Sequence, residues 1–182
     1  KDVAYDISIS IQYLKENLDN KHFNMDEFLD RFYNSRIGIR TLIGNFTSIC
    51  NGKEGIIDNR CNPYSIVSES IKDCRNLCSL NYGYTPTISL NGNTFYEFPY
   101  ISSHLKYIVS ELLKNSITAI MKNIDKDHLS DEINVMISEG EDDFFIKISD
   151  KGKGFKRSEL KNVFKYSYTT SNINFYDLKS YS

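Results

Sequence analysis

Glu111-Leu112-Leu113-Lys114-Asn115 lies in a segment, residues 103–123, whose apolar side chains recur at helical spacing. This period predicts an amphipathic helix that buries its apolar face. Tyr107, Glu111 and Asn115 are spaced one turn apart, so they are expected to share the polar edge of the helix. The apolar positions are Leu105, Ile108, Val109, Leu112, Ile120 and Met121.

Two side chains on this edge suggest a chemical role. The amide oxygen of Asn115 is a hard, neutral ligand of the kind that Mg²⁺ binds together with waters and substrate phosphates. The carboxylate of Glu111, one turn earlier, is placed to act as a base. We therefore predict a magnesium ligand at Asn115 and a catalytic base at Glu111.

A second motif, Asp150-Lys151-Gly152-Lys153-Gly154, follows a predicted strand in which Ile146 and Ile148 alternate with polar residues. Glycines allow a sharp turn and the close approach of a flat ligand. The carboxylate of Asp150 can accept a hydrogen bond from an adenine amino group. Each motif alone is common in ordinary helices and turns, but their order, with a hairpin between them, indicates a nucleotide site.

The first half of the chain has helical patterns that indicate a fragment of a helix bundle. They cover residues 3–18, a long segment opened by the capping-box sequence Asn24-Met25-Asp26-Glu27, and residues 64–80. The expected apolar face of the long helix consists of Phe28, Phe32, Ile39, Leu42 and Phe46.

The second half has strand patterns around the motif helix. Asn91-Gly92, between residues 87–90 and 94–97, predicts a tight hairpin. Residues 133–137 and 144–148 predict a second pair of strands. After the glycine motif we expect a helix with Leu160, Val163 and Phe164 directed inward. This order of elements predicts an α+β fold with a mixed sheet on one side of the helices.

The composition of the chain argues against a nucleic-acid-binding protein and against a membrane-spanning one. The chain has 182 residues, a net charge of -2 and a sequence pI of about 6.0, which gives no electrostatic case for nucleic-acid binding. No apolar run reaches membrane-spanning length, and no signal or transit peptide is visible. The four cysteines lack metal-site spacing and are expected to be buried and reduced.

The two motifs in this order resemble the ATP-binding domain shared by sensor histidine kinases, heat-shock chaperone ATPases, type II topoisomerases and the mitochondrial protein kinases. Further stretches resemble the pyruvate and branched-chain 2-oxoacid dehydrogenase kinases. Tyr107 and Thr169-Thr170 place the chain nearer the branched-chain member of that family, because the pyruvate dehydrogenase kinases usually have His and Ser-Thr there. The further stretches are residues 31–40, 97–101, 148–154 and 166–170.

This resemblance implies a helical bundle fragment for lipoyl docking at residues 1–84. It also implies a histidine-kinase-like ATP-binding domain, an α/β sandwich with a mixed sheet, at residues 85–182. A mobile lid would begin at Thr169-Thr170, and the family's second glycine box does not follow in the sequence. On this interpretation the domain is truncated at the lid, so that adenine recognition survives while phosphate binding and activity are impaired.

The resemblance further implies an ATP-dependent serine kinase that inactivates a dehydrogenase component of a 2-oxoacid dehydrogenase complex in the mitochondrial matrix. Partners would be the lipoyl domain of the acyltransferase core and a second copy of the chain. Glu111 would be catalytic and Tyr107 would modulate it, with Mg²⁺ on Asn115. ATP contacts would come from Asn115, Thr118, Asp150, Gly152, Gly154, Thr169 and Thr170, and backbone carbonyls for K⁺ from Val163, Lys165 and Tyr168.

Two departures from the family pattern leave alternatives open. Thr118 stands where the family usually has Arg, and Lys153 interrupts the usual run of glycines. A threonine cannot replace the bidentate phosphate contacts of an arginine. The alternatives are a degenerate kinase that acts as a non-catalytic scaffold, and another ATPase of the class, such as a chaperone or sensor kinase. His22, His104 and His128 are not followed by an acidic residue, which argues against a phosphohistidine relay.

Overall fold

The computed structural model describes residues 24–121, 131–141 and 143–166, together with residues 7, 10 and 13. The chain forms two compact units, residues 1–41 with 155–182 and residues 42–154. None of the helices in the described ranges has the length and apolarity that crossing a bilayer requires.

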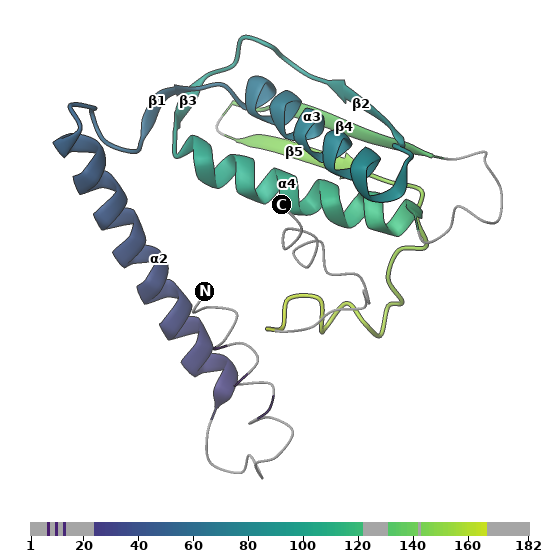
Figure 1. Ribbon diagram of the computed structural model, residues 1–182, viewed down its shortest axis with the longest axis horizontal. Helices are drawn as coiled ribbons and strands as arrows, with labels where there is room; N and C mark the ends of the chain where they lie inside the picture. Colours follow the sequence, from purple (N-terminus) through teal and green to yellow (C-terminus); the bar gives the residue numbers. More distant parts are fainter. Residues whose placement is uncertain are drawn as a thin grey trace. The chain divides into compact units, whose positions relative to one another are not determined.

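Helix α2, Met25–Cys50, begins where the capping sequence predicts (Figure 1). The side chain of Asn24 accepts the backbone N–H of Glu27 at 3.3 Å, which confirms its capping role. The expected burial of the apolar face is wrong at four of its five residues, because Phe28, Ile39, Leu42 and Phe46 are 46%, 56%, 72% and 70% exposed. Most of the helix predicted at residues 3–18 lies outside the described residues, although residues 7, 10 and 13 are helical.

The larger unit contains the mixed sheet that the sequence predicts, and its strand order is β2-β4-β5 (Figure 1). Strand β2, Thr87–Asn91, pairs in parallel with β4, Glu132–Glu139. Strand β5, Phe144–Ser149, pairs antiparallel with β4, so the predicted second strand pair is confirmed. Ile133, Val135 and Ile137 alternate along β4 and are buried on one face of the sheet.

The hairpin predicted at Asn91-Gly92 is wrong. The chain leaves β2 at this point and next forms β3, Phe98–Tyr100, which pairs with β1, Asp58–Cys61, in a separate two-stranded sheet. Gly92 has a φ of 153° and lies against β4, where a Cβ would approach the Cβ of Ile137 to 2.7 Å and its carbonyl oxygen to 2.8 Å. The glycine is therefore explained by close packing against a neighbouring strand.

Gly92→Ala is expected to lower the free energy of unfolding by about 1–3 kcal/mol, because the new methyl group overlaps backbone and side-chain atoms of Ile137. Urea denaturation would measure the change. Gly38→Ala is the control, since Gly38 lies in α2 with no atom within 4 Å of its Cβ position. The control should leave stability unchanged or raise it by up to about 1 kcal/mol. Equal stability of Gly92→Ala and the parent would contradict the proposed packing constraint.

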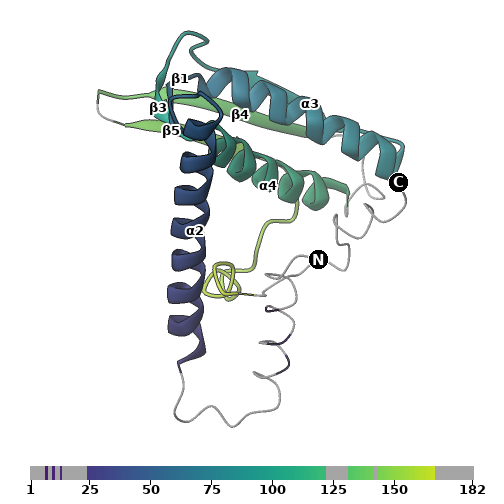
Figure 2. The ribbon, with the colours of Figure 1, turned by 60° about the vertical axis from the view of Figure 1, so that its left-hand side comes forward.

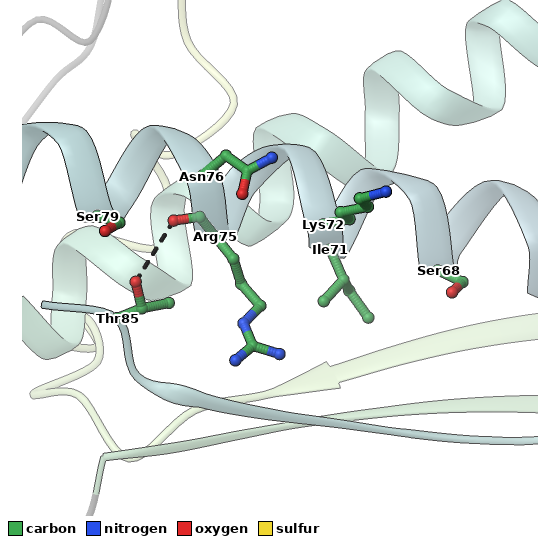
Figure 3. Close-up of a pocket in the computed structure, with 7 residues that line it drawn as sticks. All are labelled: Ser68, Ile71, Lys72, Arg75, Asn76, Ser79 and Thr85. Atoms are coloured by element: carbon green, nitrogen blue, oxygen red, sulfur yellow. Dashed lines mark hydrogen bonds between the residues drawn. The ribbon is translucent and has the colours of Figure 1, made fainter.

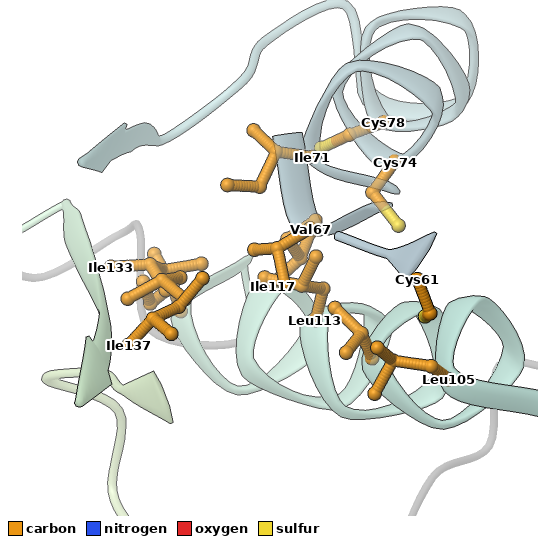
Figure 4. Close-up of a cluster of buried hydrophobic side chains, with 13 residues drawn as sticks. Cys61, Val67, Ile71, Cys74, Cys78, Leu105, Leu113, Ile117, Ile133 and Ile137 are labelled. Atoms are coloured by element: carbon orange, nitrogen blue, oxygen red, sulfur yellow. The ribbon is translucent and has the colours of Figure 1, made fainter. Parts of the chain in front are cut away.

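Two helices cover the buried face of the sheet (Figure 2). Helix α3, Pro63–Tyr82, starts at Asn62, whose side chain accepts the N–H of Ser65 at 2.9 Å, and ends at Gly83, which has a φ of 66°. Helix α4, Ser102–Met121, is the helix predicted around Glu111. The two helices and β4 therefore share one core (Figure 4).

The buried face of α4 differs from the predicted one. Ile108 and Leu112 are 48% and 47% exposed, whereas Leu113 and Ile117 are almost completely buried. The spacing of apolar residues alone allowed either the face with Ile108 and Leu112 or the face with Leu113 and Ile117 to be buried. Packing against α3 and β4 buries the face with Leu113 and Ile117. The core residues of α4 are Leu105, Val109, Leu113, Ile117 and Ile120.

The cysteine prediction holds for three of four residues. Cys61, Cys74 and Cys78 are buried and free, whereas Cys50 is free but exposed. Burial raises the pKa of Cys74 to about 11, and nearby Lys114 opposes that shift. The Cys74 thiol, 3.8 Å from the carbonyl oxygen of Ser110, marks the contact between α3 and α4.

The helix expected after Gly154 is wrong within the described residues. Residues 157–164 form successive turns, with N–H groups of Glu159, Asn162 and Lys165 donating to carbonyls three residues earlier. Leu160 and Phe164 are 55% and 95% exposed, so no buried apolar face stabilises a longer helix.

The predicted domain boundary between residues 84 and 85 falls between α3 and β2. Both helices, α3 and α4, contribute to one hydrophobic core, so this boundary separates elements that pack together. It stays a prediction about domain organisation.

Candidate functional site

A row of residues on one face of α4 contains the predicted base and the predicted metal ligand. Glu111, Asn115 and Ala119 follow one another at intervals of four residues, so they lie along one face of the helix. Asn115 is exposed and Glu111 is partly buried. The amide of Asn115 is therefore open to a ligand, as the predicted metal site requires.

The glycine motif contacts the C-terminal end of this row. Gly152 donates its N–H to Oδ1 of Asp150 at 2.9 Å, which forms a tight turn after β5. A Cβ on Gly152 would lie 2.7 Å from the Cβ of Ala119 and 3.1 Å from the carbonyl carbon of that residue. The glycine motif therefore meets α4 at Ala119, one turn after Asn115, through a contact that only glycine permits.

Asp150 and Gly154 remain accessible beside this contact. Asp150 is exposed, and the hydrogen bond to Gly152 holds one of its carboxylate oxygens. Gly154 has a φ of 62° with no atom within 4 Å of a Cβ position. The turn thus presents a carboxylate and an unobstructed backbone, the two features that adenine binding was predicted to use.

Lys114 forms an ion pair with the predicted catalytic base. Its Nζ lies 2.5 Å from Oε1 of Glu111, and the lysine and glutamate side chains are 15% and 32% exposed. This pair was not anticipated from the sequence. The i, i+3 spacing of opposite charges on a helix was a usable signal for it.

Two other predicted residues of α4 lie near this pair. The hydroxyl of Thr118 donates to the backbone carbonyl of Lys114 at 2.8 Å, so it is directed back onto the helix. Tyr107 is 63% exposed, one turn before Glu111. The structure therefore gives Thr118 a local backbone contact and places Tyr107 on the open polar edge.

The remaining predicted residues lie after the glycine motif. Val163 is partly buried, and Lys165 is exposed and donates its N–H to the carbonyl of Asn162 at 2.9 Å. Tyr168, Thr169 and Thr170 lie outside the described residues. The predicted K⁺ and lid contacts therefore stay predictions.

Tyr166 fastens the turns after the glycine motif to α2 within the smaller unit. Its hydroxyl donates to Oδ1 of Asp30 at 2.5 Å, and its ring stacks on Tyr33 with centroids 5.2 Å apart. The hydrogen bond to Asp30 raises the pKa of Tyr166 to about 12. The phenol therefore remains a neutral donor at physiological pH.

A separate groove of about 460 Å³ lies beside α3 (Figure 3). Thr85 borders it and donates to the carbonyl of Arg75 at 3.3 Å. None of the residues predicted to bind nucleotide lines this groove. Its lining consists of Ser68, Ile71, Lys72, Arg75, Asn76, Ser79 and Thr85.

Among the described residues, no group of three or more His, Cys, Asp and Glu side chains could hold a metal ion. The metal prediction therefore rests on the neutral amide of Asn115. Such a site fits a cation that keeps most of its ligands as waters and substrate phosphates.

Gly152→Ala is expected to lower the free energy of unfolding by about 1–3 kcal/mol, because its methyl group overlaps Ala119. Adding Ala119→Gly removes the closest of these overlaps. We expect the double variant to be more stable than the sum of the two single effects predicts, although Ala119→Gly alone costs about 1 kcal/mol in a helix. Strict additivity in a urea-denaturation cycle would show that Gly152 and Ala119 do not contact each other.

Two family models match the chain. Residues 1–67 match the model described as mitochondrial branched-chain alpha-ketoacid dehydrogenase kinase. Residues 101–178 match the histidine kinase-, DNA gyrase B- and HSP90-like ATPase model, and this range includes both nucleotide motifs. The boundary predicted between residues 84 and 85 lies in the interval between the two matches.

Curated relatives match across nearly the whole chain. A mitochondrial pyruvate dehydrogenase (acetyl-transferring) kinase of Arabidopsis thaliana is 35% identical over 174 residues, covering 91% of this chain and 47% of the relative. The Schizosaccharomyces pombe kinase of the same name is 34% identical, covering 93% and 42%. Isozyme 1 of Mus musculus is 32% identical, covering 81% and 37%. The chain thus spans less than half the length of these relatives.

The names of the relatives and of the first family model test the prediction that the chain lies nearer the branched-chain member of the family. The relatives just described are pyruvate dehydrogenase kinases, whereas the model that matches residues 1–67 has the branched-chain name. The predicted placement nearer the branched-chain member is therefore not confirmed.

Proposed function

We propose that this chain is an ATP-dependent protein-serine kinase, on the premise that it belongs to the family of mitochondrial pyruvate and branched-chain 2-oxoacid dehydrogenase kinases. Its substrate would be the dehydrogenase component of a 2-oxoacid dehydrogenase complex, which phosphorylation inactivates. The observation that supports this function most directly is the contact between Gly152 and Ala119, which joins the predicted metal and base helix to the predicted adenine turn.

The described residues fit a bound nucleotide and Mg²⁺. Gly152 lies so close to Ala119 that a Cβ would overlap it, Asp150 is exposed beside this contact, and Asn115 lies one turn from Ala119 on the same helix face. Asp150 would accept the adenine amino group, and Gly154 would leave room for the ring. Asn115 would hold Mg²⁺, which supplies positive charge to the phosphates when it is bound.

The reaction proposed for these residues is direct transfer. Glu111 orients the substrate serine and accepts the proton of its hydroxyl. The serine oxygen forms a bond to the γ-phosphorus while the bond from that phosphorus to the β–γ bridging oxygen breaks, and ADP leaves. Tyr107 would modulate Glu111 from the preceding turn.

Further ligand contacts belong to the same proposal. Thr118, Thr169 and Thr170 would contact ATP, and the backbone carbonyls of Val163, Lys165 and Tyr168 would bind K⁺. By analogy with the family, we propose that the protein acts in the mitochondrial matrix, docks through its helical half to the lipoyl domain of the acyltransferase core and pairs with a second copy. The names of the relatives support the mitochondrial location.

A non-catalytic scaffold is the second candidate. One observation favours it: the hydroxyl of Thr118, at a position where the family usually has Arg, donates to the helix backbone. Such a protein would bind nucleotide or the lipoyl domain without phosphoryl transfer.

The two candidates differ in one assay. The full-length protein is incubated with γ-labelled ATP and Mg²⁺, separately with purified pyruvate and branched-chain dehydrogenase complexes. Acid-stable phosphoserine on a dehydrogenase component supports the kinase and identifies its substrate. ATP binding without any transfer supports the scaffold, and acid-labile phosphate on His22, His104 or His128 would indicate a sensor-kinase mechanism instead.

A further inference from the structure

We propose that Lys114 is a positioning residue that fixes the carboxylate of Glu111 for catalysis. This inference rests on the proposed kinase function. It assigns a role to a side chain that is neither a predicted nucleotide contact nor a predicted metal ligand.

The geometry of the pair supports this role. Lys114 Nζ lies 2.5 Å from Glu111 Oε1, and only 15% of the lysine side chain is exposed. A largely buried ammonium group requires a paired anion, because desolvation of an isolated charge is costly. The lysine therefore has a strong preference for the rotamers that keep it at Glu111, and the carboxylate is restrained in turn.

Helix α3 contributes a neutral thiol and two acidic side chains near the lysines of α4. Cys74 of α3 lies near both members of the pair, donates to the carbonyl of Ser110 and is a neutral thiol at physiological pH. The acidic groups on this part of α3, Glu69 and Asp73, contact Lys106, one α4 lysine earlier, at 2.8 and 3.0 Å. Each of these two lysines of α4 thus has an acidic partner of its own.

Lys106 is for this reason a matched control. Lys106 and Lys114 are both α4 lysines in ion pairs, but Lys106 holds α3 whereas Lys114 holds Glu111. Lys→Met removes the charge from either side chain and keeps its length. Only the change at Lys114 should affect the orientation of the base.

The test measures kinetics in the full-length enzyme. Lys114→Met should lower kcat about 10- to 100-fold, as expected when a reacting group is misplaced, with the dissociation constant and KM for MgATP unchanged. Lys114→Arg should restore most of the rate, and Lys106→Met should retain the parental kcat. In a Glu111→Gln background, Lys114→Met should cause no further loss, because its effect passes through that carboxylate.

A second measurement does not depend on activity. A crystal structure of Lys114→Met should show the Glu111 carboxylate displaced from its parental orientation. An unmoved carboxylate, a kcat equal to that of Lys106→Met, or a further loss in the Glu111→Gln background would each overturn the positioning role. If the parent transfers no phosphate to either complex, the proposed function fails, and the crystal structure alone decides the role of Lys114.

Discussion

Glu111→Gln lowers the rate of phosphoryl transfer by about 10²- to 10⁴-fold in our expectation, while MgATP binding stays at the parental level. The amide keeps the size of the side chain but cannot accept the serine proton, and a well-placed general base contributes about this factor. Glu111 also neutralises a lysine that is only 15% exposed. We therefore expect a moderate loss of stability as well, because the substitution replaces the carboxylate that pairs with that charge by a neutral amide.

Separate measurements distinguish these two effects. Single-turnover kinetics give the rate of transfer, calorimetry gives MgATP affinity, and urea denaturation gives stability. Glu27→Gln is the control, since Glu27 pairs with Arg31 on the exposed surface of α2 and its loss should change none of the three strongly. A parental transfer rate in Glu111→Gln, or a loss of affinity that accounts for the whole effect, would remove Glu111 from the catalytic role.

Asn115→Ala should have the complementary effect and weaken MgATP binding by at least about 100-fold. Loss of an outer-shell partner of a metal typically costs about 10- to 100-fold, and a direct ligand should cost no less. Asn115 is exposed on the polar edge of α4, so its removal should leave stability close to that of the parent. Calorimetry with MgATP, followed by the same titration in excess EDTA, measures the metal-dependent part.

The metal dependence decides the interpretation. Parent and variant should bind nucleotide equally weakly once EDTA removes Mg²⁺, because the difference between them lies in the metal contact. Asn76→Ala, on the exposed surface of α3, is a control for loss of a helix-surface amide. Equal affinity of Asn115→Ala and the parent for MgATP would exclude Asn115 as the magnesium ligand.

Local sequence determined the features that depend on a few neighbouring residues. Asn24 and Asn62 cap the N-terminal ends of α2 and α3 by accepting backbone N–H groups of the first turn. Gly83 provides the left-handed residue that ends α3. The alternation around Ile133 and Ile146 was enough to predict the β4–β5 pair. The spacing of Glu111 and Asn115 likewise sufficed to place both on one edge of α4, because helix geometry alone sets that relationship.

Tertiary structure decided the features that depend on which surfaces meet. Asn91-Gly92 has the local chemistry of a hairpin, yet β2 pairs in parallel with β4, and Gly92 is needed for packing against Ile137. Leu113 is buried in place of Leu112 because α3 and β4 pack on that side of α4. The contact of Gly152 with Ala119 joins segments distant in sequence, and the burial of Lys114 turns an ordinary helix ion pair into a restraint on Glu111. The apolar periodicity of a segment specifies which of its faces can be buried. The neighbouring helix or strand that packs on the segment determines which side chains belong to the core and which belong to the functional site.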